Sequence, residues 1–435
     1  MTTLLQYLCR LGKFAPLGLI ALMLLLQCLQ AQPYPQDDLL RNVTAYAWGF
    51  DYSKVYPFAP GFPHFDPYLG FDWVLGQASQ LVGPAGSVVI AQLSGTVALL
   101  LALLAPLRKK DDRAYRATLA IALVAATLVT SRLAGGRPEI WATVWLLSAA
   151  SLPPRAWLLL GVLLSPFYWL MPMYALGALM LSVPFRQRVL FLLIAIVGTS
   201  AFWLGYAGQE WVHTALSLPA LNYRPIPAIE AGALHNLLGY PGTWLLLAAL
   251  GITALWHRRR LQHYDIGFPV VGFLLIGSVR HILVLAPLLA MWVAMQPWPR
   301  PRVNAWSAIS FLALAAGLMS ASQLAGHQGP RFTLPAGSVV LSGYNPAVFY
   351  LPFHNPGTIS MAPSIESGWD SPRVVTLAQH VSAGTLTCAA LAGTTFTHVV
   401  TRESRPLNGH CFTVSATQPG WALWRHTPTY SQLAR

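Results

Sequence analysis

Two adjacent acids and an arginine follow the first long apolar run of the chain, in the stretch DDLLR. Carboxylates such as Asp37 and Asp38 at the edge of a membrane are suited to act as a general base for a hydroxyl group. In a structural alternative, one acid caps a short helix, DDLLRNVTAYAWG, that ends at Gly49, and Arg41 forms an ion pair with the acids before it. Capping needs only one acid, however, and a second carboxylate is unfavourable near hydrocarbon. The pattern therefore marks Asp37 and Asp38 as candidate catalytic residues and Arg41 as a candidate binding residue.

A second group of ionisable residues stands in SRLAGGRPEIW, residues 131–141. The two glycines favour a turn, Pro138 suits the first position of a helix, and Glu139 suits its first turn, where the helix dipole favours an acid. This leaves Arg132 and Arg137, basic residues on the external side, where short loops usually carry few. Because a guanidinium fork is a good phosphate ligand, Arg137 and Glu139 are candidate substrate-binding residues.

A third group is the pair Arg280 and His281 in GSVRHILVL, which forms a very short turn between two apolar runs. A turn needs polar residues, and that alone explains the pair. Serine or asparagine would satisfy a turn equally well, however, and the pair lies at the depth of lipid headgroups. We therefore expect Arg280 and His281 to bind a lipid phosphate.

A long aromatic loop, WGFDYSKVYPFAPGFPHFDPYLGFDW, follows the DDLLR stretch. Aromatic belts at the membrane interface explain a few of these residues. Aromatic faces with scattered acids, here Asp51, Asp66 and Asp72, also suit a sugar ring, which offers hydroxyls at its rim and C–H groups on its faces. Glu210 and His213 in a later loop are expected to join this surface. Otherwise their segment, GQEWVHTAL, is an interfacial amphipathic helix.

The composition around these residues is that of a multi-pass, α-helical membrane protein. Of the 435 residues 55% are hydrophobic and only 9% are charged, far fewer than in a soluble domain. The proline-broken stretch 156–183 either crosses the membrane twice, giving about eleven segments, or dips into it, giving nine. Since about 20 apolar residues span a bilayer, strong segments are expected at 14–31, 87–106, 115–133, 189–206, 242–256, 281–296 and 304–322, and weaker ones at 138–152, 156–167, 168–183 and 265–278.

The net charge of +13 indicates the orientation in the membrane, not an affinity for nucleic acid. More than half of the 27 basic residues lie in short loops between apolar runs, which the positive-inside rule places in the cytoplasm. The alternate loops are then external: 32–86, 134–138, 207–241 and 278–281. No basic face with interleaved aromatic residues is present, so nucleic acid is not an expected partner.

The tail from residue 323 changes character and predicts a small external α/β domain. The segment SVVLSGYNPAVF reads as a strand with a turn at Asn345 and Pro346, PRVVTLAQHVSAG as a helix, and FTHVVT and HCFTVSA as strands. If this domain lies outside the cytoplasm, a disulfide between Cys388 and Cys411 is expected. The chain thus divides into a transmembrane module, 1–322, whose first external loop is 32–86, and a tail domain, 323–435.

Motifs of other chemistries are missing. The sequence contains no HExxH, no Cys/His cluster at zinc spacing, no Walker loop and no G-x-S-x-G elbow. No metal ligands are therefore assigned.

The order of these features resembles the GT-C superfold of membrane glycosyltransferases. In that superfold a first membrane helix runs into a long external loop that opens with an acid pair and an arginine, here DDLLR; a second short loop carries an acid, here GGRPE; many helices and an external C-terminal domain follow. Examples are the aminoarabinose transferase of lipid A, the protein O-mannosyltransferases and the bacterial arabinofuranosyltransferases. The resemblance implies transfer of a sugar from a polyprenyl-phosphate donor to a protein, lipid or glycan acceptor, at the periplasmic face of a bacterial inner membrane.

By position, the resemblance makes Asp37 or Asp38 the base that deprotonates the acceptor hydroxyl, with Asp37 favoured as the first acid of the pair. Glu139 matches the acid of the second loop, which binds a metal in some relatives and orients a substrate in others. Arg137, Arg280 and His281 would hold the lipid phosphate. The acid-arginine spacing differs from that of the lipid A enzyme, and the Trp-Trp-Asp tail motif of oligosaccharyltransferases is missing, so use of a divalent metal stays open.

A different class of protein fits the same features. In a lipid-linked sugar flippase or carrier, or a glycan polymerase-like protein, the acids and arginines would be substrate ligands within the membrane. The acids and arginines here gather at one face, and the inverted repeat of many transporters is not apparent. Glycosyl transfer is therefore the favoured interpretation.

Overall fold

The computed structural model describes residues 39–58, 64–105, 136–222, 329–362 and 371–427. Its contacts divide the chain into two compact units. The loop–tail unit combines residues 33–88 with 327–435, and the helical unit comprises residues 89–326 with 1–32. The segment predicted to be the first external loop and the tail therefore belong to one compact unit.

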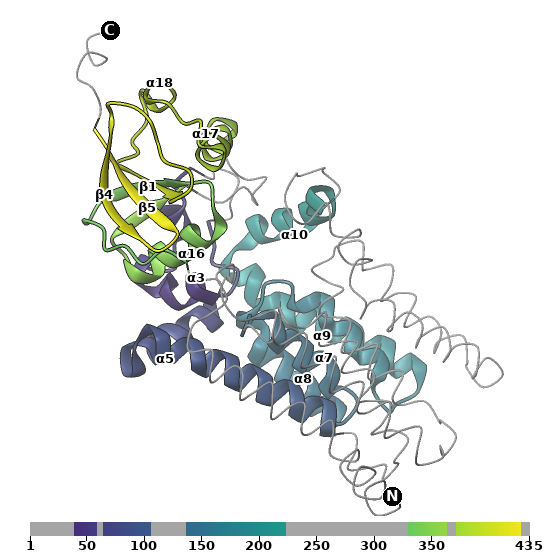
Figure 1. Cartoon of the computed structure of the whole chain (residues 1–435). Coiled ribbons are helices and arrows are strands. Elements are labelled where there is room, and N and C mark those ends of the chain that lie inside the picture. Colours follow the sequence, from purple (N-terminus) through teal and green to yellow (C-terminus); the bar gives the residue numbers. More distant parts are fainter. Residues whose placement is uncertain (1–38, 59–63, 106–135, 223–328, 363–370, 428–435) are drawn as a thin grey trace, which may run out of the picture. The chain divides into compact units, whose positions relative to one another are not determined.

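The loop–tail unit is built on a five-stranded mixed sheet with the strand order β2-β1-β3-β5-β4 (Figure 1). Strand β1 pairs in parallel with β2 and with β3, whereas β5 is antiparallel to both β3 and β4. The strands are β1 (Ser338–Ser342), β2 (Ile359–Met361), β3 (His398–Arg402), β4 (Phe412–Gln418) and β5 (Trp421–His426).

Two helices cover opposite faces of this sheet, and the strands supply apolar side chains to both faces. Helix α16 (Asn345–His354) packs with Val340 and Val400, whereas α17 (Pro372–Ala383) packs with their neighbours Leu341 and Val399. Successive strand residues point to opposite faces, so a run of apolar residues is typical of a strand covered on both sides.

The tail confirms most of the elements predicted from its sequence. The first strand, the helix from Pro372 and the strands β3 and β4 lie close to the expected positions. At Asn345 the chain enters helix α16 instead of making only a turn, and β5 was not anticipated. The disulfide between Cys388, at the start of α18 (Cys388–Leu391), and Cys411 is present as expected.

The first loop begins, within the described residues, with α3 (Leu39–Thr44), η1 (Ala45–Trp48) and α4 (Tyr52–Val55). The predicted helix end at Gly49 is confirmed. Gly49 has φ 65° and its N–H bonds back to the carbonyl groups of Ala45 and Tyr46. Glycine adopts this left-handed conformation without the steric penalty of a side chain, so it terminates the helix.

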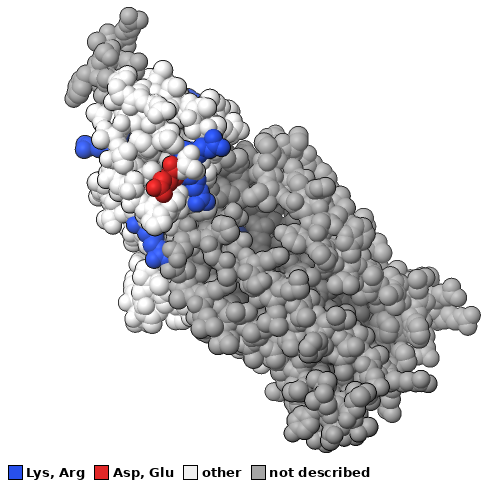
Figure 2. All heavy atoms as spheres, in the orientation of Figure 1, with Lys and Arg blue, Asp and Glu red and all other residues white. Residues whose placement is uncertain are grey.

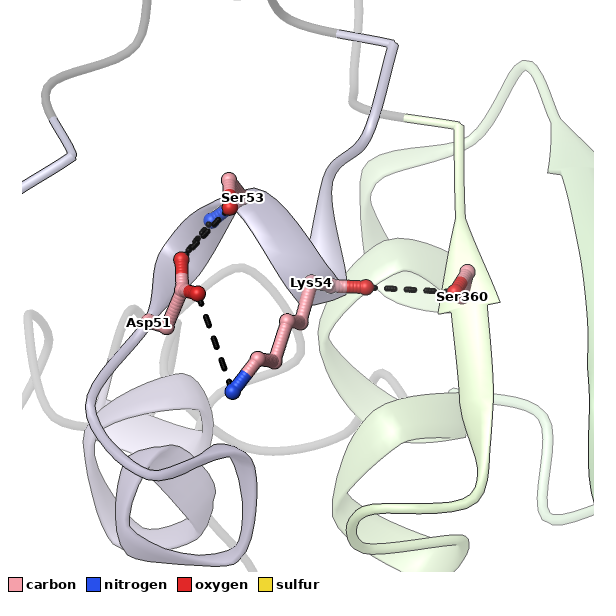
Figure 3. Close-up of polar contacts among 4 residues, drawn as sticks. All are labelled: Asp51, Ser53, Lys54 and Ser360. Atoms are coloured by element: carbon pink, nitrogen blue, oxygen red, sulfur yellow. Dashed lines mark hydrogen bonds and ion pairs between the residues drawn. The ribbon is translucent and has the colours of Figure 1, made fainter.

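The loop packs directly on the tail sheet. Ala45, Trp48 and Tyr56 are buried in the same core cluster as α16 and β2. At the edge of the sheet, the Ser360 hydroxyl donates a hydrogen bond to the Lys54 carbonyl at 3.1 Å (Figure 3). The Phe58 ring lies 4.9 Å from that of Phe396. A segment close to the N-terminus thus completes the core of a C-terminal domain.

Helix α5 (Leu69–Leu104) leaves the loop and continues into the helical unit. It is kinked at Gly83, which has φ 77° and ψ 165°, immediately before Pro84. Proline cannot continue the hydrogen bonding of a helix, and the extended, positive-φ conformation of Gly83 is available only to glycine. The sequence GP therefore separates an initial helical segment, 69–82, from the part predicted to span the membrane.

The helical unit contains α7 (Glu139–Ser148), α8 (Pro154–Leu164), η3 (Ser165–Phe167), η4 (Met171–Met180), α9 (Phe185–Tyr206) and α10 (Gly208–Asn222). Buried indoles connect these helices. The rings of Trp145 and Trp157 stack at 4.8 Å, and each indole N–H donates to the backbone carbonyl of the other residue, at 2.8 and 2.9 Å. Trp203 donates to Ser165 and Trp211 to Trp169, both at 3.0 Å. A buried tryptophan packs as an apolar side chain while its N–H donates a hydrogen bond to a backbone carbonyl group.

Two described helices are long and apolar enough to cross a membrane: residues Leu69–Leu99 of α5, and α9. Helix α9 leaves many apolar side chains exposed, including Leu193 and Val197. The stretch 156–183 forms the short apolar elements α8, η3 and η4, which break near Pro166 and Pro172 as predicted. The predicted span 138–152 contains only the ten-residue helix α7 (Glu139–Ser148), which is too short to cross a bilayer alone. The remaining predicted spans lie outside the described residues. The described surface in view in Figure 2 belongs mostly to the loop–tail unit and carries a small acidic patch with Lys and Arg side chains beside it.

Candidate functional site

The structure describes four of the eight predicted site residues. Asp37, Asp38, Arg280 and His281 lie outside the described residues. Arg41 belongs to the loop–tail unit, whereas Arg137, Glu139 and Glu210 belong to the helical unit. Each set is described within its own unit.

In the loop–tail unit, Arg41 lies near two buried carboxyl groups, Asp66 and Asp72. Arg41 lies in helix α3. Asp66 lies three residues before the start of α5, and Asp72 lies in the first turn of α5. Both carboxyl groups have 0% exposure, and Arg41 is partly buried. Asp66 Oδ1 accepts a hydrogen bond from the Tyr68 N–H at 2.8 Å. The side chains of Asp66 and Asp72 are hydrogen-bonded to each other, with the charge of Arg41 close enough to act on Asp66.

Burial controls the protonation of this cluster. It raises the pKa of Asp66 to about 7, against the opposing effects of the Tyr68 N–H, the Asp72 side chain and the Arg41 charge. A hydrogen bond between two carboxyl groups requires a proton on one of them. The raised pKa makes Asp66 the candidate for holding this proton, next to a candidate membrane helix.

The acids of the aromatic loop do not form the exposed sugar-binding surface that the sequence suggested. Asp66 and Asp72 are buried as described above. Asp51 begins the short helix α4, where it accepts hydrogen bonds from the backbone N–H and hydroxyl of Ser53 and lies 3.7 Å from the Lys54 ammonium (Figure 3). The bond from the Ser53 hydroxyl, more than any other contact, lowers the pKa of Asp51. These contacts give Asp51 a local structural role.

In the helical unit, Arg137 and Glu139 form a buried ion pair at the start of α7. Arg137 Nη1 lies 3.7 Å from Glu139 Oε1, and their side chains are only 6% and 13% exposed. Gly136, with φ 79°, makes the turn predicted before this helix. Glu139 is the first residue of α7, which matches the expectation of an acid in the first turn. The guanidinium group predicted to bind phosphate is thus paired with the acid two residues away.

Glu210 and His213 lie in α10, so their segment is helical, as the amphipathic alternative predicted. Glu210 is partly buried in the first turn, and its carbonyl accepts a hydrogen bond from the Thr214 hydroxyl at 2.8 Å. His213 is exposed. Neither residue belongs to the unit that contains the aromatic loop, so no shared surface with the loop is assigned.

Within the described ranges, no group of three or more His, Cys, Asp or Glu side chains is arranged to hold a metal ion. No protein-family model matches the chain, and no curated protein does either.

The carboxyl pair is the part of the site that sequence reasoning missed. Asp66, Asp72 and Arg41 were each noted, but separations of six and twenty-five residues do not match the repeat of a helix or strand. The one local signal is Asp66 two residues before Tyr68, a position where an acid commonly bonds the N–H at a helix start.

Proposed function

We propose that the protein is a membrane glycosyltransferase that moves a sugar from a polyprenyl-phosphate donor to an acceptor on the external face of the membrane. The observation that carries this proposal is the cluster of Arg41, Asp66 and Asp72 beside the start of α5. Buried ionisable groups with a perturbed pKa gather at functional sites more often than elsewhere, and ionisable groups close to hydrocarbon are rare without a function.

The cluster supports the proposal by fixing the segment that follows the predicted base. Asp37 and Asp38 precede α3 by two and one residues, and α3 is held through Arg41, next to Asp66, and by burial of Leu39 and Leu40. A catalytic carboxylate needs such a fixed support, because small displacements of a base cost much of its rate. Arg41 is thus assigned to positioning, with Asp37 or Asp38 as the base.

The reaction proceeds by displacement at the anomeric carbon. Asp37 or Asp38 accepts the proton of the acceptor hydroxyl, whose oxygen forms the new bond to the anomeric carbon. The bond from that carbon to the phosphate oxygen breaks, and its electron pair leaves with the polyprenyl phosphate. A phosphate leaving group needs little help from an acid, but its charge is stabilised by cationic contacts. Arg280 and His281 are the residues proposed to supply them.

The test is transfer by the purified full-length protein. Synthetic polyprenyl phosphates carrying arabinose, aminoarabinose or mannose are incubated with it and with membrane extract from cells that lack the protein, which supplies the acceptor. Release of polyprenyl phosphate and appearance of sugar in the acceptor are measured. A glycosyltransferase releases the lipid phosphate; a flippase or carrier moves the intact donor across vesicles and releases none.

The matched variants are Asp37→Asn and Asp38→Asn, compared with Asp51→Asn, which changes a partly exposed acid of the same loop. Loss of a general base lowers the rate by about 10²–10⁴-fold, whereas loss of a helix cap changes stability by about 1 kcal/mol. One of the first two variants should be folded and nearly inactive, with Asp51→Asn active. Near-normal transfer by both would rule out the catalytic assignment.

A further inference from the structure

A row of three side chains crosses the tail sheet at the carboxyl ends of β1 and β3. Ser342 pairs with Val400, so Arg402 on β3 lies beside Tyr344, which follows the end of β1 and packs against the cores on both faces of the sheet. Arg402 is directly opposite Trp421 on β5. The row Tyr344, Arg402 and Trp421 therefore follows from the strand register.

The middle member of this row is a preorganised guanidinium group. Its central carbon lies 3.8 Å from the centre of the Trp421 ring and 5.6 Å from that of Tyr344. The two rings meet edge to face at 5.8 Å. Stacking fixes the plane of a guanidinium group but leaves the N–H donors at its edge available, and this edge matches the geometry of a carboxylate or phosphate.

A second arginine and a hydroxyl flank Arg402. Arg405 is exposed in the turn after β3, where its N–H bonds to the Arg402 carbonyl at 2.9 Å. The Tyr344 hydroxyl donates a hydrogen bond to the Ser382 carbonyl at 3.3 Å, which holds the tyrosine ring beside Arg402. Burial raises the pKa of Tyr344, and the charges of the two arginines oppose that effect.

No acid neutralises the two arginines in the described part of the chain. Neither Arg402 nor Arg405 forms a salt bridge there. The adjacent acid, Glu403, is exposed and accepts a hydrogen bond from the Gly420 N–H at 3.2 Å. Two cationic groups with unused donors thus stand together at one edge of the sheet.

The sheet topology favours a ligand at this edge. After β1 the chain passes through α16 to β2 on one side of β1, whereas β3 lies on the other side and is followed by the hairpin of β4 and β5. In open α/β sheets, ligands bind outside the carboxyl ends of the strands where the strand order reverses in this way.

From this geometry we propose that Arg402 and Arg405 form a binding site for an oxyanion, either a phosphate or a carboxylate group. Arg402 binds two oxygens through its fixed edge, Arg405 adds charge from solvent, and the rings of Trp421 and Tyr344 hold Arg402 in place. The site is on the tail sheet and is separate from the proposed catalytic residues. The proposal does not rest on glycosyl transfer, because it is tested as binding.

The first experiment uses the full-length protein in detergent with inorganic phosphate or acetate as the probe, at constant ionic strength set with chloride. Arginines are modified with phenylglyoxal, and the modified peptides are quantified by mass spectrometry. Phosphate or acetate should slow modification of Arg402 and Arg405 but not of Arg425, an exposed arginine of β5 that serves as an internal control. Equal rates for all three with and without both probes would overturn the proposal.

The second experiment measures affinity by calorimetry with whichever probe gives the stronger protection. Tighter binding of phosphate identifies the ligand as a phosphate group, and tighter binding of acetate identifies it as a carboxylate group. Arg402→Gln should weaken binding roughly 10- to 100-fold, the effect of one charge-assisted contact. Arg405→Gln should weaken it less, and Arg425→Gln should leave it unchanged. If Arg402→Gln fails to fold, Arg405→Gln decides the result. Affinity of Arg405→Gln equal to that of Arg425→Gln would then contradict the site.

Discussion

Both units bury ionisable groups, but they do so in different ways. In the loop–tail unit, Asp66 and Asp72 are fully buried, and burial raises the pKa of Asp66 against the charge of Arg41. In the helical unit, the acid Glu139 lies 3.7 Å from the base Arg137 in a buried ion pair. The first arrangement favours a carboxyl group that holds a proton, whereas the second pairs an acid with a base.

The units also differ in what holds them together. The loop–tail unit joins segments nearly three hundred residues apart through a sheet, two core clusters and a disulfide. In the helical unit, indole N–H groups bond to backbone carbonyl groups of neighbouring segments. Reduction of the disulfide should therefore destabilise the loop–tail unit, and replacement of Trp145, Trp203 or Trp211 should destabilise the helical unit.

The largest effect is expected from breaking the ion pair between Arg137 and Glu139. Arg137→Met leaves the Glu139 carboxylate buried without its cation, and such changes typically destabilise by about 3–5 kcal/mol. Arg155→Met, at an exposed arginine of the same unit, should change stability little. The measurement is the thermal unfolding midpoint of the purified protein in detergent. The double variant Arg137→Met/Glu139→Gln should recover most of the loss, and failure to recover any would show that the ion pair is not its cause.

Removal of the disulfide should have the next largest effect and should be confined to the loop–tail unit. Replacing Cys388 and Cys411 by serine should cost about 2–4 kcal/mol, because the bridge limits the freedom of the unfolded tail. Hydrogen exchange of β3 and β4 should accelerate, with α8 and α9 unchanged. Alkylation without prior reduction serves as a check in protein from an oxidising compartment: two free thiols would contradict the pairing.

The sequence predicted elements whose cause is local. Gly49 ends a helix because glycine tolerates a positive φ, Glu139 starts one because an acid suits its first turn, and two prolines break the stretch 156–183. The strands β3 and β4 could be predicted from their β-branched residues. Each of these follows from neighbours within a few residues.

What the sequence did not reveal depends on tertiary contacts. The packing of Trp48 and Tyr56 on the tail sheet joins parts of the chain that no periodicity relates. Asp66 and Asp72 are buried as well, whereas the sequence suggested that these scattered acids belong to an exposed sugar-binding surface. Helix α16 begins at Asn345 and Pro346, where the sequence predicted a turn, because proline suits the start of a helix as well as a turn.

The raised pKa of Asp66 predicts a pH dependence of stability in the loop–tail unit. The pKa of Asp66, about 7 in the folded protein, lies above the usual value near 3.9, so the folded state binds this proton more tightly. Its contribution to stability is complete below about pH 4 and is lost as pH rises through about 7, with a slope of at most about 1.4 kcal/mol per pH unit.

This dependence is measured as hydrogen exchange at the start of α5 between pH 5 and 8, corrected for intrinsic rates. Asp66→Asn should flatten the profile, whereas Asp51→Asn, at an acid of the same loop whose pKa is lowered, should keep it. An unchanged profile in Asp66→Asn would assign the proton elsewhere in the cluster.

The smallest effect is expected from the indole bonds that distinguish the helical unit. Trp145→Phe keeps an aromatic ring against Trp157 but removes the N–H that donates to the Trp157 carbonyl at 2.8 Å. Loss of one buried hydrogen bond, together with the volume of the missing ring, should destabilise by about 1–2 kcal/mol. Trp73→Phe is the matched control, because Trp73 is 55% exposed on α5. Exchange of α7 and α8 amides should accelerate in the first variant only. If both variants behave alike, stacking alone holds these helices and the N–H groups add nothing; if only Trp145→Phe responds, the reciprocal bonds are a specific feature of this unit.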